Sequence, residues 1–160
     1  MTTDPQNINL DNLQQCSLQD RADIYKLELA TLALVITARK TQLKKFLSAT
    51  LMHTLGTANG IYSIILMRNN DKLLAIIYAL LMLGWARIGF IKSDIKNIAK
   101  RDFYESLDLY NRLKKVLETT TPKQIHDIAE TYRKDFPDIN DLTPDNIKSA
   151  LNKIMLKYER

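Results

Sequence analysis

The hydrophobic residues of this chain are concentrated in two runs near its middle, Leu47–Met67 and Leu73–Ile91, separated by the polar sequence RNNDK. The second run contains one charged residue, Arg87, and approaches the ~20 apolar residues with which a helix crosses a bilayer. The first run has no Asp, Glu, Lys or Arg but is richer in Ser, Thr and Asn. The pattern therefore predicts a transmembrane hairpin over residues 47–91, with spans at 47–67 and 73–91.

All four glycines of the chain lie inside these two runs. Glycine lets helices approach closely in a membrane, whereas a soluble chain more often places some glycines in turns. We therefore expect Gly56, Gly60 and Gly84 to contribute to helix packing. Gly56 and Gly60 have the spacing of a GxxxG contact.

Polar segments flank the hairpin. Residues 1–16 carry a proline and many amides, and are expected to form a flexible arm. Ser17 followed by Asp20 resembles a capping box, after which apolar residues recur at helical spacing. This pattern predicts an amphipathic cytosolic helix over residues 17–46 that packs on other cytosolic helices or lies on the membrane surface. The recurring positions are Ile24, Leu27, Thr31, Leu34 and Ala38.

Residues 92–160 are predicted to form a cytosolic helical region. No Pro or Gly occurs before residue 122, so the second membrane helix is expected to continue to about Glu118 as a stalk. Thr-Pro pairs at 121–122 and 143–144 predict the starts of two short helices. The stalk has an apolar side that packs either within the chain or against another chain. Its members are Phe103, Leu107, Tyr110, Leu113 and Leu117.

The expected fold is therefore all-α, with an integral membrane two-helix hairpin between cytosolic helices. The net charge is +5, and the distribution of the basic residues supports an orientation for the hairpin. Lys and Arg cluster at both of its ends, whereas the turn carries only Arg68 and Lys72. By the positive-inside rule, both termini then face the cytoplasm and the turn faces outward. Anionic headgroups account for these clusters more simply than nucleic acid does, so no nucleic-acid partner is expected.

The sequence carries no recognisable catalytic motif. It lacks a Gly-rich phosphate loop, GxSxG, HExxH and CxxC, and its histidines, His53 and His126, lie in no metal-ligand pattern. The single cysteine, Cys16, excludes an internal disulfide. We therefore expect no enzymatic activity, no cofactor and no metal site, and expect another protein to sense any small-molecule signal.

The polar residues of the first run form two helical stripes. Polar groups that face hydrocarbon are costly, so each stripe should meet another helix or water. One hairpin supplies one partner helix, which favours a homo-oligomer in which one stripe lines an aqueous path. Helix packing is the alternative for the polar stripes, and snorkelling to headgroups is the alternative for Arg87. The candidate pore-lining or gate residues are Thr50, His53, Thr57, Asn59 and Arg87.

The order of elements is an amphipathic helix ending in ARKTQLKK, a membrane hairpin, and the charged helix KSDIKNIAKRDFYESLDLYNRLKKVLE. This order resembles the SLATT family, two-transmembrane effector domains associated with SMODS nucleotidyltransferases and SLOG sensors in bacterial conflict systems. The resemblance covers about Arg21 to Asp138 and consists of architecture and residue texture, so it carries over no catalytic residue. It implies a pore-forming effector that disrupts the membrane in antiphage defence or abortive infection.

The resulting hypothesis is an oligomeric effector that disrupts membrane integrity or potential. Its partners would be the bilayer, further copies of the chain, and a nucleotide-signal sensor or another defence protein. Three alternatives stay open at this point. They are a non-conducting membrane anchor whose cytosolic helices bind another protein, a holin-type phage lysis protein, and a soluble bundle with residues 73–91 as its central helix.

Overall fold

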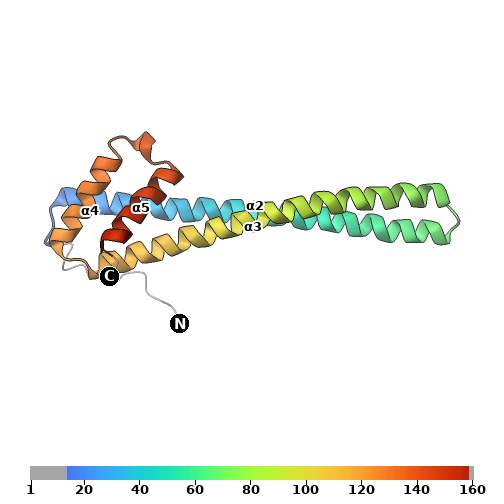
Figure 1. Ribbon diagram of the computed structural model, residues 1–160, viewed down its shortest axis with the longest axis horizontal. Coiled ribbons are helices and arrows are strands. Elements are labelled where there is room, and N and C mark those ends of the chain that lie inside the picture. The colour runs from blue at the N-terminus through green and yellow to red at the C-terminus, as the bar shows by residue number, and fades with distance from the viewer. Residues whose placement is uncertain (1–13, 159–160) are drawn as a thin grey trace. The chain divides into compact units, whose positions relative to one another are not determined.

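The computed structural model describes residues 14–158, apart from the side chain of Ile139. Within this range the chain is all-helical, as predicted (Figure 1). A short 3-10 helix, η1, spans Ile139–Asp141. The predicted arm at residues 1–16 lies almost entirely outside the described residues. The α helices are α2 at Leu18–Arg68, α3 at Lys72–Thr119, α4 at Pro122–Asp135 and α5 at Pro144–Tyr158.

Local capping sets the helix starts where the sequence predicted them. At the start of α2, the backbone N–H of Asp20 donates to Ser17 Oγ at 3.1 Å. At the start of α4, the backbone N–H of Thr121 donates to the side-chain oxygen of Gln124 at 2.8 Å. Proline occupies the first position of both α4 and α5, where no helical hydrogen bond is lost.

The helices α2 and α3 are joined by a tight turn. The N–H of Asp71 donates to the carbonyl of Leu66 at 3.0 Å, and the N–H of Asn70 donates to the carbonyl of Met67 at 3.3 Å. This pair of bonds is a Schellman motif, which satisfies carbonyls at the end of α2. Asn70 has a φ of 65°, a left-handed conformation that asparagine adopts more readily than most residues.

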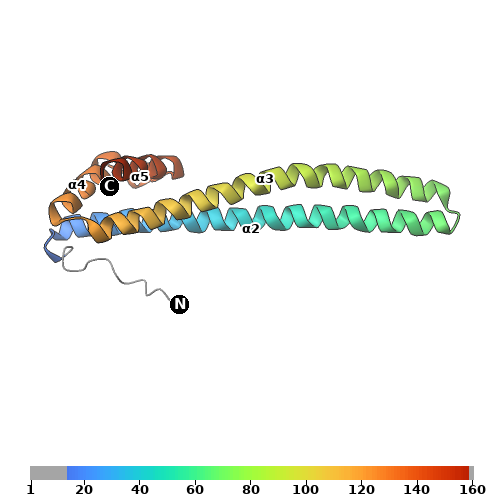
Figure 2. The same cartoon turned by 60° about the horizontal axis from the view of Figure 1, so that its bottom comes forward.

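The chain divides into two compact units. The four-helix unit comprises Met1–Thr37 and Tyr104–Arg160, and the hairpin unit comprises Ala38–Phe103. The predicted boundary at residue 46 between a cytosolic helix and a membrane span produces no break, because α2 is one continuous helix. In the four-helix unit, α4 and α5 lie against the start of α2 and the end of α3 (Figures 1 and 2).

Large aliphatic side chains from all four helices build the core of the four-helix unit. Ile24 and Leu27 of α2, Leu113 of α3, Ile128 of α4 and Leu151 of α5 are each at most 1% exposed. Of the recurring positions predicted for α2, Ile24, Leu27, Thr31 and Leu34 are buried, whereas Ala38 is half-buried. The buried face of α4 is also the predicted one, and consists of Ile125, Ile128, Ala129 and Tyr132.

The buried face of α3 differs in part from the predicted stripe. Leu107 and Tyr110 are half-buried, while Leu109 and Val116 are each 3% exposed. The core therefore uses Leu109, Leu113 and Val116, which follow a seven-residue pattern. The N-terminal part of the predicted stripe, at Leu107 and Tyr110, was displaced by part of a helical turn from the residues that are buried.

Candidate functional site

The two helices of the hairpin unit meet along a seam of small side chains. On α2, Ala49 is 2% exposed and Gly56 is buried. On α3, Ala75 is 1% exposed, Gly89 is buried and Ala99 is 6% exposed. Small residues let two backbones approach closely, which is how helices associate in lipid, where apolar burial alone gives no driving force.

Two of the predicted packing glycines lie in this seam. A Cβ atom placed on Gly56 would lie 3.5 Å from the backbone nitrogen of Ala86, and one on Gly60 would lie 2.6 Å from the sulfur of Met82. A larger side chain at Gly56 would therefore meet the backbone of α3, whereas at Gly60 it would first meet the end of a flexible side chain.

The other two glycines of the hairpin differ from each other. A Cβ atom on Gly89 would lie 2.9 Å from the ring of His53, so Gly89 makes room for that ring. At Gly84, no atom of the described chain lies within 4 Å of such a Cβ. The third predicted packing glycine is thus exposed outside the seam, and Gly89, which the sequence analysis did not single out for packing, lies within it.

Large apolar side chains of the hairpin unit point outward. Exposed fractions reach 75% at Leu73, 71% at Ile64 and 68% at Phe90. Among the described helices, α3 alone is long and apolar enough to cross a membrane, with an 18-residue window of mean hydropathy 2.0 that is only 11% buried. One candidate span is therefore present, and the second span of the predicted hairpin stays a prediction.

The polar side chains of the first run bond mostly to their own helix. Thr54 and Thr57 donate to the carbonyls of Thr50 and His53 at 2.9 and 3.0 Å, and Asn59 donates to the carbonyl of Leu55 at 2.7 Å. Such bonds to the preceding turn satisfy the donors locally. The sequence predicted that these polar side chains would meet another helix or water. Their hydrogen bonds to the preceding turn make such a partner unnecessary for the donors.

Two side chains of the first run reach α3 instead. Ser63 Oγ donates to the carbonyl of Ala75 at 2.7 Å. His53 Nε2 lies 3.2 Å from Ser93 Oγ, and its ring meets Phe90 edge to face at 6.1 Å between centroids. His53 is therefore a contact between the two helices of the hairpin, in addition to being partly exposed.

The remaining candidate residues fall in different places. Thr50, Thr57 and Arg87 are exposed on the hairpin unit, and Arg87 has no hydrogen bond or ion pair with any described residue. The predicted stalk residues are also spread out. The guanidinium of Arg39 lies 5.0 Å above the ring of Phe103, whereas Leu117, 2% exposed, belongs to the core of the four-helix unit.

The four-helix unit holds a buried charge cluster that sequence reasoning missed. Asp20 and Asp23 of α2 are only 4% and 2% exposed. Arg133 of α4 joins them, because its Nε donates to Asp23 at 2.6 Å and its Nη2 donates to Asp20. His126 Nδ1 lies 3.0 Å from Asp20, and Lys26 Nζ lies 3.3 Å from Asp23. The cluster therefore ties α4 to the first turns of α2.

The partners in this cluster keep its carboxylates ionised. Burial alone raises the pKa of Asp20, but hydrogen bonds from His126, Ser17 and Arg133 outweigh it, so the pKa lies below its usual value. Burial also raises the pKa of Asp23, but hydrogen bonds, above all the one from Arg133, outweigh burial and lower the pKa below its usual value. The hydrogen bond to Asp20 raises the pKa of His126 above its usual 6.5. No buried side-chain nitrogen or oxygen within residues 14–158 lacks a hydrogen-bond partner.

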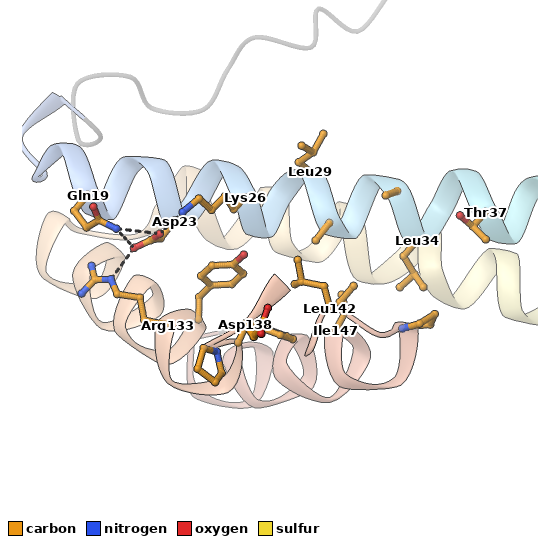
Figure 3. A pocket seen from close by; sticks show the side chains of 16 residues that line it. Gln19, Asp23, Lys26, Leu29, Leu34, Thr37, Arg133, Asp138, Leu142 and Ile147 are labelled. Carbon is orange, nitrogen blue, oxygen red and sulfur yellow. Dashed lines mark hydrogen bonds and ion pairs between the residues drawn. The ribbon is translucent and has the colours of Figure 1, made fainter. Parts of the chain in front are cut away.

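A cavity of about 790 Å³ opens beside the cluster, between α2 and the connection from α4 to α5 (Figure 3). Asp23, Lys26 and Arg133 lie at one end of it. A mostly apolar cavity of this size with a few polar groups is typical of a ligand or peptide site. Its apolar lining is Leu29, Ala30, Ala33, Leu34, Phe136, Leu142 and Ile147.

The sequence contained one signal for the cluster. Asp20 and Asp23 fall on the same helical face as Ile24 and Leu27, so burial of the apolar residues implies burial of the carboxylates. The partner, Arg133, is more than a hundred residues away and carries no local signal. No group of acidic, His and Cys residues within the described chain is arranged to hold a metal ion.

Comparison with protein-family models, with curated proteins and with solved structures finds no match.

Proposed function

We propose that the chain is a bacterial inner-membrane effector that assembles with further copies and perturbs the integrity or potential of the membrane. The observation that supports this proposal is the inverted packing of the hairpin unit. Its buried positions are mainly Ala and Gly, and most of its large apolar side chains, such as Leu73 and Phe90, are exposed. Exposing such an apolar surface to water costs free energy, whereas exposing it to hydrocarbon does not.

Both hairpin helices cross the bilayer in this proposal, and the four-helix unit lies in the cytoplasm. The supporting charge pattern is the concentration of Lys and Arg at residues 39–45 and 92–101, at the ends away from the turn. The polar turn at residues 69–71 then lies on the outer side.

Assembly would place the exposed Thr50 and Thr57 of several copies around a polar path, with Arg87 toward its cytoplasmic mouth. The resemblance to SLATT effectors supports this part of the proposal. No covalent chemistry is required, because loss of the potential removes ~2.3 kcal/mol per charge per 100 mV from every process driven by it.

Depolarisation of growing bacteria tests the proposal. A potential-sensitive dye is read after induced expression of wild type and of Thr50→Val/Thr57→Val, which removes two hydroxyls and keeps the side-chain shape. Ile61→Val is the matched control, because Ile61 is exposed on the same helix and loses bulk without losing polarity. We expect depolarisation by wild type and the control, and less by the double variant at equal membrane abundance. A membrane-inserted wild type that leaves the potential unchanged at high expression would contradict the proposal.

A second candidate is a non-conducting anchor whose four-helix unit binds another protein. The local hydrogen bonds of Thr57 and Asn59 favour it, because they leave no need for a polar path, and the cavity supplies a binding surface. Ala33→Trp fills the cavity, and Ser149→Trp is the control on an exposed site outside it. The anchor predicts loss of the cellular phenotype in Ala33→Trp alone and no effect of the threonine variants.

A further inference from the structure

One face of α2 in the four-helix unit is apolar and exposed. It lies away from the core residues Ile24, Leu27 and Thr31, and its five large side chains have exposed fractions between 37% and 80%. We name this surface the outer stripe. Its members are Leu18, Ala22, Tyr25, Leu29, Leu32 and Ile36.

The outer stripe has the spacing of a coiled coil. Its members follow one another at alternating steps of four and three residues, which is the a and d pattern of a heptad. A scatter of single exposed apolar residues is ordinary, but an unbroken heptad along one helix is not. The apolar pattern runs unbroken from Leu18 to Ile36 and is interrupted at its next position by Arg39, so the outer stripe ends close to the end of this segment of α2.

We infer that the outer stripe binds the outer stripe of a neighbouring copy of this chain in a parallel coiled-coil contact. The inference rests on the proposed function, since copies anchored in one membrane share their orientation and their height above it. The same residue of each copy then meets its counterpart, which is the geometry that a parallel coiled coil requires.

The area of the stripe fits a membrane-anchored partner. Its exposed side chains offer on the order of 500 Å² per copy, less than the ~800 Å² per partner of a standard stable interface. Such a contact is weak between freely diffusing molecules. Anchoring raises the effective concentration of one copy around another, so a small contact suffices.

The other apolar stripe considered for contact between chains is partly covered within the chain. Leu113 and Leu117 of α3 are buried in the core of the four-helix unit. The charged residues next to the outer stripe are also engaged within their own chain, since Arg21 donates to the Cys16 carbonyl and Lys26 pairs with Asp23. The contact between copies is therefore mainly apolar.

Cysteine cross-linking in membranes tests the contact. In full-length protein with Cys16→Ser, Leu32→Cys places a thiol on the stripe, and Ser149→Cys places one on an exposed site of α5. After mild oxidation of isolated membranes, we expect Leu32→Cys to form disulfide-linked dimers several-fold faster than Ser149→Cys. Adding Tyr25→Glu and Ile36→Glu, neither of which lines the cavity, to Leu32→Cys should abolish that advantage without changing the amount of protein in the membrane fraction.

Three results would overturn the inference. Equal cross-linking of Leu32→Cys and Ser149→Cys would mean random collision. Absence of cross-linking together with protection of Leu32→Cys from a water-soluble maleimide would mean that lipid or another protein covers the stripe. Cross-linking that survives both Glu substitutions would place the contact elsewhere.

The test is separable from the proposed function. Cross-linking at Leu32→Cys with an unchanged membrane potential would support the contact between copies and contradict the proposed pore. Depolarisation without cross-linking at Leu32→Cys would support the proposed pore and contradict the contact through the outer stripe.

Discussion

The four-helix unit and the hairpin unit follow opposite packing rules in one chain. In the four-helix unit, Leu27, Leu113 and Ile128 are fully buried. In the hairpin unit the buried positions are mainly Ala and Gly, and Leu, Ile and Phe face outward. Burial of large apolar groups drives folding in water, whereas close backbone approach matters more in lipid. The four-helix unit is therefore packed as proteins that fold in water are, and the hairpin unit is not.

The largest expected effect is a contrast between two leucines. Leu113→Ala should destabilise the four-helix unit by about 3 kcal/mol, because Leu113 is fully buried and its removal leaves a cavity. Leu83→Ala should change the thermal unfolding temperature little, because Leu83 is 59% exposed in the hairpin unit. Thermal unfolding of both proteins in detergent measures this contrast. Equal losses would show that the outer face of the hairpin is packed against something.

A smaller effect is expected from a pair of glycines. Gly56→Leu should weaken the hairpin by roughly 1–3 kcal/mol, because the new side chain overpacks the seam against the backbone of Ala86. Gly84→Leu is the matched control, since its Cβ meets open space. With Cys16→Ser, the rate of disulfide formation between Ser63→Cys and Ala75→Cys reports the distance between the helices. A slower rate in Gly84→Leu than in Gly56→Leu would contradict the seam.

The smallest effect concerns pH and His126, which is more than half exposed. Its pKa is raised in the folded state, so the stability it contributes is full below 6.5 and is lost as the pH rises through the raised value. The pKa values of Asp20 and Asp23 are lowered, so their contribution is present above 3.8 and is lost as the pH falls through the lowered values. The four-helix unit should therefore be most stable between these limits.

The decline on the alkaline side should vanish in His126→Asn, which cannot gain a proton. Unfolding temperatures of wild type and variant between pH 5 and pH 9, measured at constant ionic strength, check this expectation. A wild-type unfolding temperature that does not change across this range would show that His126 contributes no pH-dependent stability to the four-helix unit.

Local signals explain how far the sequence could predict this fold. Thr-Pro pairs mark the starts of α4 and α5, and the lack of Pro and Gly after residue 91 predicts that α3 continues to about residue 118. These features depend on neighbours in the chain. The buried cluster depends on Arg133 meeting Asp20 across the fold, which no local pattern encodes.

The register of α3 shows the same limit. Apolar and aromatic residues occupy about half of the positions from Phe103 to Leu117, so composition permits several stripes. Contact with α2, α4 and α5 selects Leu109 and Val116 over Leu107 and Tyr110. The polar residues of the hairpin illustrate another gap, because helical spacing places a hydroxyl on a face but does not reveal that it bonds to its own backbone.

The single cysteine, Cys16, reports local opening of the four-helix unit. Cys16 is 8% exposed, its thiol lies 3.8 Å from the carbonyl oxygen of Pro122, and burial raises its pKa. A thiol reagent can therefore reach it readily only when the start of α2 separates from α4. Because no other cysteine competes, the labelling rate of the unmodified protein reports these openings without an attached dye.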